Sequence, residues 1–163
     1  MTWDKYFVSM LYLIAMKSKD QKTQNATIIV GPDNEIRSTG YNSFPRGIND
    51  NLPERQERPE KYLWMEHGER NAIFNAARVG VSLKGCRAYV SGIPCMDCAR
   101  GLVQVGVVKV IVHILKDYKS GLWEEHAIRT LKLFYEAGVI VSKYQGDLIT
   151  KMAVLRDGEL IEI

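Results

Sequence analysis

The chain has 163 residues, of which 46% are hydrophobic and 25% charged, and its formal net charge at pH 7 is +3. This composition is typical of a globular protein and excludes a disordered chain, so we expect one domain over residues 1–163 with a substantial core. The small positive charge argues against a protein that wraps nucleic acid, but it suits an anionic small substrate.

The N-terminal half predicts a helix and a β-hairpin. Thr2 is a suitable N-cap for a first helix that should continue to about Lys19. The apolar run at residues 6–16 is too short to span a membrane, so we expect an amphipathic packed helix and no signal peptide. Residues 26–30 and 35–41 are rich in β-forming side chains and flank a turn, so they should pair as a hairpin.

Residues 42–61 predict a long irregular segment. It contains three of the five prolines of the chain and few large apolar residues. Irregular segments of this length are more often functional than idle, and this one leads towards His67. The alternative is a solvated surface insertion.

The rest of the chain alternates between helices and strands. We expect helices at residues 62–79, 95–105 and 123–137, and strands at residues 86–92, 107–115 and 139–141. The apolar sides of the first and last helices should include Phe74, Val79, Ile128, Leu131 and Phe134. The order of elements predicts an α/β fold, a three-layer sandwich with a central five-stranded mixed sheet. Asp157 and Gly158 predict the turn of a C-terminal hairpin, to which we assign no function.

Two short stretches have the residue types of a catalytic zinc site. His67 stands two residues before Glu69, and a proline precedes Cys95, with Cys98 three residues later. Catalytic zinc commonly has three protein ligands, histidine nitrogen or cysteine sulfur among them, and leaves a fourth position to water. We therefore predict that His67, Cys95 and Cys98 are metal ligands and that Glu69 is the catalytic proton carrier. The pattern H-x-E followed by P-C-x-x-C is the signature of zinc nucleobase deaminases.

Local structure supports this pairing of stretches. Cys95 and Cys98 should share one face at the start of a helix that follows a strand, and His67 also opens a helical pattern. The unpaired N–H groups at a helix start favour thiolates. Two helix N-termini should therefore converge on one metal ion.

Other roles for these cysteines remain open. A C-x-x-C motif alone can be a redox pair or half of a structural zinc site. Cys86 is the only further cysteine, so a Cys₄ site within one chain is excluded, whereas a site of three cysteines and a histidine is awkward but open. Three cysteines are too few for a disulfide framework and favour a reducing, cytoplasmic location. His113 and His126 are expected to have packing or surface roles.

The chain resembles the deoxycytidylate deaminases of the cytidine deaminase superfamily. The resemblance is carried by residues 3–7, 40–47, 67–73 and 94–99, and it extends over about residues 3–145. It implies a cytidine deaminase-like fold and hydrolysis of dCMP to dUMP and ammonia, which would supply dUMP for thymidylate synthesis. The chain departs from the family at Gly68, where alanine is common, and at residues 25–27, where Asn-Ala-Thr replaces Val-Gly-Ala.

The resemblance also implies contacts with the nucleotide. Asn42 matches a residue that contacts the sugar hydroxyl, and Ser91 one whose backbone faces the exocyclic amine. Tyr118 falls where the family has an aromatic residue near the nucleotide, and the adjacent Lys119 is our candidate for the 5′-phosphate. Ala26 lies at the expected base pocket.

Regulation is a further implication of the resemblance. Lys22 and Arg46 are weaker phosphate candidates, and Phe44 and Arg46 belong to the segment that could form an allosteric site. Many family members form homohexamers that are activated by dCTP and inhibited by dTTP, with Mg²⁺ accompanying the triphosphate. The alternatives are a deaminase of dCTP, cytidine or a polynucleotide, or a catalytically silent nucleotide sensor that zinc stabilises. We expect neither a membrane nor a nucleic acid as a partner.

Overall fold

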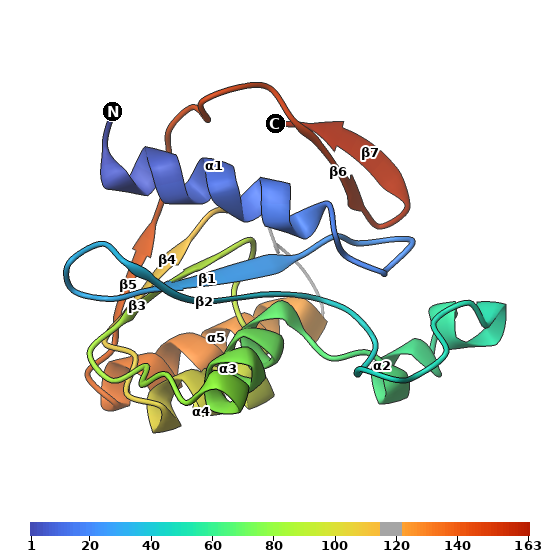
Figure 1. Cartoon of the computed structure of the whole chain (residues 1–163), viewed down its shortest axis with the longest axis horizontal. Helices are drawn as coiled ribbons and strands as arrows, with labels where there is room; N and C mark the ends of the chain where they lie inside the picture. The colour runs from blue at the N-terminus through green and yellow to red at the C-terminus, as the bar shows by residue number, and fades with distance from the viewer. Residues whose placement is uncertain (115–121) are drawn as a thin grey trace.

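The computed structural model describes residues 1–114 and 122–163, which form three layers (Figure 1). The middle layer is a five-stranded sheet in the order β2-β1-β3-β4-β5. β1 (Ala26–Val30) pairs antiparallel with β2 (Ile36–Tyr41) and with β3 (Arg87–Val90). β3, β4 (Lys109–Val112) and β5 (Ile140–Lys143) are parallel. The predicted sandwich with a five-stranded mixed sheet is confirmed.

Helices cover both faces of the sheet. α1 (Trp3–Ala15) lies on one face, and α3 (Gly68–Val79), α4 (Met96–Gln104) and α5 (Leu122–Glu136) lie on the other (Figure 1). Every residue of β1 is buried, as expected for a strand that is covered on both sides. Alternate β1 side chains therefore enter two separate apolar cores, one under α1 and one under the three other helices.

The first helix begins where predicted but ends earlier. The Thr2 hydroxyl oxygen accepts a hydrogen bond from the Lys5 N–H at 3.2 Å, which is the expected N-cap. The helix stops at Ala15 instead of continuing to about Lys19. The reason is tertiary, because the Ser18 hydroxyl donates to the Asn42 carbonyl oxygen at 2.8 Å and draws the chain towards the end of β2.

The predicted helix at residues 62–79 is wrong in its first part. A short α2 (Lys61–Trp64) ends before the chain becomes extended at Met65, and α3 starts only at Gly68. Glu66 instead exchanges two backbone hydrogen bonds with Ser43, at 2.9 and 3.0 Å. This long-range bridge interrupts the helix and leaves His67 at the start of α3.

The predicted apolar sides of α3 and α5 are only partly buried. Phe134 is buried as expected, whereas the exposed fractions are 46% for Phe74, 62% for Ile128 and 40% for Leu131. Small residues, Ala72 and Ala76, form the buried side of α3 instead. Helix α3 therefore approaches the sheet closely, with Ile73 packed against the core and Phe74 and Val79 exposed.

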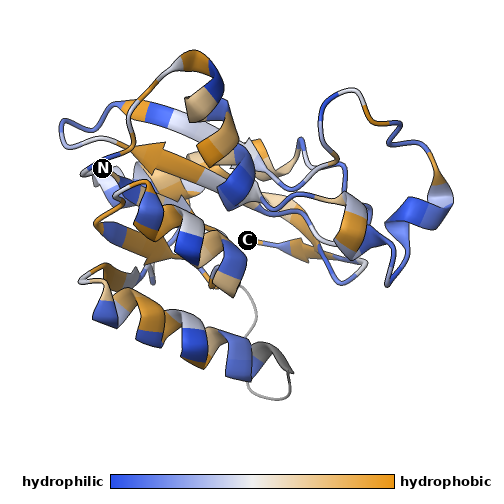
Figure 2. Cartoon of the chain, turned by 90° about the horizontal axis from the view of Figure 1, so that it is seen from below, coloured by the Kyte–Doolittle hydropathy of each residue, from blue (hydrophilic) through white to orange (hydrophobic). Residues whose placement is uncertain are grey.

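The segment between β2 and α2 projects from the body of the molecule (Figure 1). It is largely irregular apart from one 3₁₀ turn, η1 (Pro53–Gln56). The sheet strands are coloured mainly hydrophobic and this segment mainly hydrophilic (Figure 2). The irregular character predicted for residues 42–61 is confirmed.

The C-terminal hairpin is also confirmed. β6 (Ala153–Arg156) and β7 (Glu159–Glu162) pair antiparallel as a separate two-stranded sheet on the α1 side (Figure 1). Asp157 and Gly158 have φ values of 50° and 84°, as a tight hairpin turn requires. Among the helices that the structure describes, none combines the length and apolar character needed to cross a bilayer.

His113 generates a pH-dependent prediction. Its Nδ1 lies 2.6 Å from the Tyr12 hydroxyl, and burial, followed by the charges of Arg156 and Lys143, lowers the pKa of the imidazole. The unfolded chain should therefore bind a proton before the folded chain does, so stability present above pH ~6.5 is lost as the pH falls below it. The free energy of unfolding of His113→Gln should fall less between pH 7.5 and 5.5 than that of wild type. Urea unfolding at both pH values measures this, and equal losses in both proteins would contradict it.

Candidate metal and catalytic centre

Three side chains from two helix starts meet at one point. The His67 Nδ1 atom lies 3.5 Å from the Cys95 sulfur and 3.6 Å from the Cys98 sulfur, and all three atoms lie within 4.8 Å of one another. A tetrahedral zinc ion with Zn–S near 2.3 Å and Zn–N near 2.0 Å separates its ligand atoms by about 3.5–3.8 Å. The donor set and its spacing therefore fit a zinc ion.

Backbone geometry aims these side chains at each other. His67 is the N-cap residue of α3 and Cys95 the N-cap residue of α4, both with extended backbone, and Cys98 lies in the first turn of α4. The first N–H groups of both helices therefore surround the cluster and favour negative charge there. The predicted meeting of two helix N-termini is confirmed.

The two thiols differ in their tendency to lose a proton. The Cys98 thiol and then His67 hydrogen-bond to the Cys95 sulfur, which lowers the pKa of Cys95 to about 3. The same hydrogen bond to Cys95, together with burial, raises the pKa of Cys98, and the Cys95 thiolate raises the pKa of His67. The hydrogen bonds within the cluster therefore favour the thiolate form of Cys95, which is the form that binds zinc.

Glu69 lies in the first turn of α3, next to this cluster. Its side chain is half-buried, and burial raises the pKa of its carboxyl group, although the charge on His67 acts in the opposite direction. A carboxyl group with a raised pKa can both accept and release a proton near neutral pH. Its chemistry therefore suits the proton carrier that the sequence predicts.

Sequence reasoning missed residues that hold the two helix starts in place. Arg70 lies 2.5 Å from Glu66 and 3.6 Å from Asp97 of α4, so its guanidinium bridges the helices. The buried Thr130 hydroxyl of α5 donates to the Pro94 carbonyl oxygen at 3.0 Å. Arg70 and Glu66 have the i,i+4 spacing of a helical ion pair, which the sequence does show, whereas the contacts of Arg70 with Asp97 and of Thr130 with Pro94 join residues that only folding brings together.

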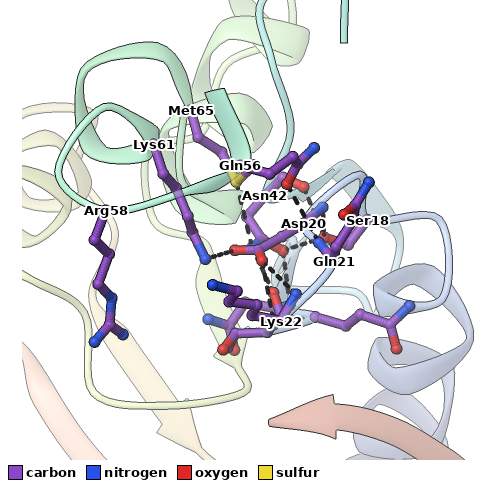
Figure 3. A network of polar contacts seen from close by, with 12 residues as sticks. Ser18, Asp20, Gln21, Lys22, Asn42, Gln56, Arg58, Lys61 and Met65 are labelled. Carbon is purple, nitrogen blue, oxygen red and sulfur yellow. Dashed lines mark hydrogen bonds and ion pairs between the residues drawn. The ribbon is translucent and has the colours of Figure 1, made fainter. Parts of the chain in front are cut away.

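Both the oxygen and the nitrogen of the Asn42 side chain form hydrogen bonds with other residues of the protein (Figure 3). Its oxygen accepts hydrogen bonds from the Asn25 N–H at 2.7 Å and the Ser18 hydroxyl at 2.6 Å. Its nitrogen donates to the Asp20 carboxylate at 3.1 Å and the Thr23 carbonyl at 2.7 Å. These four bonds exhaust the capacity of the group, so the sugar contact predicted for Asn42 would require one bond to be exchanged.

The same network contains a buried ion pair that the sequence did not reveal. The Lys61 ammonium lies 2.5 Å from the Asp20 carboxylate, and these side chains are only 9% and 3% exposed (Figure 3). The other Asp20 oxygen accepts from the N–H groups of Lys22 and Thr23, at 2.8 and 3.0 Å. The pair therefore joins residues 18–25 to the start of α2.

Ser91 and Ala26 lie together beside the centre. The Ser91 hydroxyl oxygen accepts from the Ala26 N–H at 3.0 Å, and the Ser91 carbonyl oxygen accepts from Arg156 at 3.2 Å. A Cβ atom built on Gly68 would lie 3.2 Å from the Ala26 Cα, which places the start of β1 against the residue between His67 and Glu69. The roles predicted for Ser91 and Ala26 remain predictions.

The structure gives little information on the other residues predicted to contact the nucleotide, which are Lys22, Tyr118 and Lys119. The Lys22 ammonium pairs with Glu57 at 2.6 Å on the surface. Tyr118 and Lys119 lie outside the described residues. The phosphate-binding residues therefore remain predictions.

A cavity of about 410 Å³ lies beside β2 and α3. Phe44 and Arg46 line it, and Arg46 hydrogen-bonds to Asn75 of α3. Glu66, the residue before His67, lines the same cavity. Phe44 and Arg46, the two residues predicted for an allosteric site, thus line the same cavity. Glu66 connects this cavity to the metal cluster, because it is followed in the sequence by His67.

Comparisons with known proteins agree with these features. The profile of the family described as "Cytidine and deoxycytidylate deaminase zinc-binding region" matches residues 1–114. Human deoxycytidylate deaminase is 35% identical over 147 residues, which cover 87% of this chain and 79% of the human protein. An uncharacterized deaminase of Aliivibrio fischeri is also 35% identical, covering 90% of this chain and 97% of that protein.

The fold has a close match among solved structures. The crystal structure of dCMP deaminase from cyanophage S-TIM5, in complex with dCMP and dUMP, superimposes with a TM-score of 0.70. The two proteins share 22% sequence identity, and the match covers 86% of this chain and 96% of the phage chain. At this identity the likeness demonstrates the fold alone.

Metal binding can be tested with two serine substitutions. Cys98→Ser removes one donor of the cluster and should lower zinc affinity by roughly 100-fold or more. Cys86→Ser alters a buried cysteine that directly precedes β3 and lies outside the cluster, so it should retain zinc. Competition against a chromophoric chelator measures both affinities. Equal zinc affinity in the Cys98→Ser variant and wild type would contradict the assigned cluster.

Proposed function

Because the chain belongs to the cytidine and deoxycytidylate deaminase family, we propose that it is a zinc-dependent hydrolase that converts dCMP to dUMP and ammonia. The observation that carries this proposal is the meeting of His67, Cys95 and Cys98 beside the half-buried carboxyl group of Glu69. The similarity to human deoxycytidylate deaminase supports dCMP as the substrate. The product would be a source of dUMP for thymidylate synthesis.

Glu69 would carry protons between water and the base. Zinc, when bound by His67, Cys95 and Cys98, would supply an activated water for attack on C4 of cytosine. Glu69 takes one proton from that water and delivers it to N3, which makes C4 more electrophilic. It then takes the second proton from the oxygen that has bonded to C4 and passes it to the exocyclic amine, so that the C4–N bond breaks, the C4 carbonyl forms and ammonia leaves. One carboxyl group suffices because it acts as base and acid in turn.

The substrate is identified by comparing cytosine compounds. Zinc-loaded protein is incubated separately with dCMP, dCTP, deoxycytidine, cytidine and cytosine-containing single-stranded DNA, and ammonia release is followed. We expect dCMP to have the highest kcat/KM. Faster turnover of another compound would move the assignment to that substrate, and bound zinc without any turnover would favour a silent nucleotide sensor.

Glu69→Gln tests the proton carrier. The amide keeps the shape of the side chain but cannot shuttle a proton, so kcat should fall by roughly 10²–10⁴-fold while zinc stays bound. Glu124→Gln, in the exposed first turn of α5, is the matched control and should behave like wild type. Single-turnover assays with zinc determination measure both properties. Wild-type turnover of Glu69→Gln would refute the assignment.

The cavity next to Phe44 and Arg46 supports a proposal on regulation. An Arg46 guanidinium and a Lys19 ammonium belong to its lining, and such groups bind phosphates. We expect dCTP to activate the enzyme and dTTP to inhibit it by binding there. Coupling would pass through Glu66, which lines the cavity and precedes His67.

Arg46→Gln tests this cavity. Loss of a charge-assisted phosphate contact should raise the dCTP concentration for half-maximal activation by about tenfold or more. Arg37→Gln, an exposed arginine that pairs with Glu35, is the control. An unchanged dCTP response in Arg46→Gln would place the effector elsewhere. Repeating the titration without Mg²⁺, and measuring mass by light scattering, tests the predicted Mg²⁺ and homohexamer.

A further inference from the structure

The C-terminal hairpin is bonded to the segment that enters the central sheet. The Gln24 N–H donates to the Leu155 carbonyl at 2.9 Å, and the Gly158 N–H donates to the Lys22 carbonyl at 2.8 Å. The Leu155 N–H also donates to the Gln24 side chain at 3.1 Å. The hairpin is therefore aligned with residues 22–24, directly before β1.

One residue of the hairpin reaches further, to the end of β3. Arg156 is 8% exposed, and one nitrogen of its guanidinium donates to the Gln24 carbonyl oxygen. Another nitrogen donates to the Ser91 carbonyl oxygen at 3.2 Å. A guanidinium is planar and rigid, so these two bonds tie Gln24, which precedes β1, to Ser91, which follows β3.

Both of these strand ends are close to the metal cluster, because the end of β3 leads to Cys95 and the start of β1 lies against Gly68. Ser91 also binds the start of β1, because its hydroxyl contacts the Ala26 N–H and the Asn25 side chain at 3.0 and 3.1 Å. Four residues later the chain reaches Cys95. The connecting residues are held at their far end by the hydrogen bond from Thr130 to the Pro94 carbonyl. Arg156 and Thr130 thus anchor the two ends of the segment that delivers Cys95.

We propose that Arg156 is a positioning residue for deamination, which acts by fixing residues 91–95 relative to the start of β1. The inference rests on the proposed function, since the reaction needs the cluster, Glu69 and the base aligned. A displacement near 1 Å in such a site can reduce the rate by about 100-fold. The C-terminal hairpin is then part of the catalytic structure and not only a cover for α1.

Three variants separate this role from general stability. Arg156→Met keeps the apolar stem and removes both hydrogen bonds, and Arg156→Lys keeps the charge but cannot form the two-nitrogen bridge. Both should lose between about 10- and 100-fold in kcat/KM for dCMP while retaining zinc. Lys151→Met removes an exposed cation next to the hairpin, where it pairs with Glu162 at 3.1 Å, and should match wild type.

Hydrogen exchange provides a measurement that does not depend on activity. Amide exchange in residues 91–95, followed by mass spectrometry, should accelerate in Arg156→Met and stay at the wild-type rate in Lys151→Met. The exchange rates can be compared even if the wild-type protein does not deaminate dCMP. Failure of the proposed function and failure of the positioning role are therefore distinguished.

Chemical rescue links the positioning to catalysis. Millimolar guanidinium should restore part of the kcat/KM of Arg156→Ala, whereas sodium chloride at the same ionic strength should not. Unchanged exchange in residues 91–95, wild-type kcat/KM in Arg156→Met or Arg156→Lys, or absence of rescue would each overturn the proposal.

Discussion

The close contact between helix α3 and the sheet is the constraint on which the centre depends. A Cβ atom at Gly40 of β2 would lie 2.2 Å from the Gly68 carbonyl oxygen and 2.3 Å from the Ala72 nitrogen, both backbone atoms. The helix can therefore rest on the strand only because residue 40 has no side chain. The Ser38 hydroxyl, which donates to the Ala72 carbonyl oxygen at 2.6 Å, fixes the helix further along. His67 directly precedes Gly68, so its position depends on the packing of Gly40 against the backbone of α3.

The electrostatic character of the centre follows from this placement. Hydrogen bonds from the Cys98 thiol and from His67 stabilise the thiolate of Cys95, the backbone N–H groups at the helix start add to them, and burial disfavours charge on Glu69. The pKa of Cys95 is thereby lowered, whereas the pKa of the neighbouring Glu69 carboxyl group is raised. A metal ligand and a proton carrier need these different properties.

Several expectations failed for reasons that lie outside the local sequence. A continuous helix through residues 62–79 agrees with local propensity, but the backbone bridge between Ser43 and Glu66 interrupts it. Ile128 and Leu131 have helical spacing, yet they face outward because Thr130 and Phe134 form the buried side of α5. The hydrophobic periodicity of a sequence indicates that a helix is amphipathic, but the elements that pack against the helix decide which of its sides is buried.

The sequence by itself determined the order of helices and strands, the C-terminal hairpin turn and the grouping of His67, Cys95 and Cys98. The first two depend on residue types at short spacings, because hydrophobic period and turn residues are local properties. His67 and Cys95 lie 28 residues apart, and ligand chemistry together with the two-part motif is what grouped them. Only the tertiary structure decided that Asn42 is fully engaged within the protein, that Asp20 pairs with Lys61 in the interior, and that the hairpin reaches the centre through Arg156. These contacts join segments that are far apart in the sequence, so their partners become neighbours only when the sheet and helices have packed.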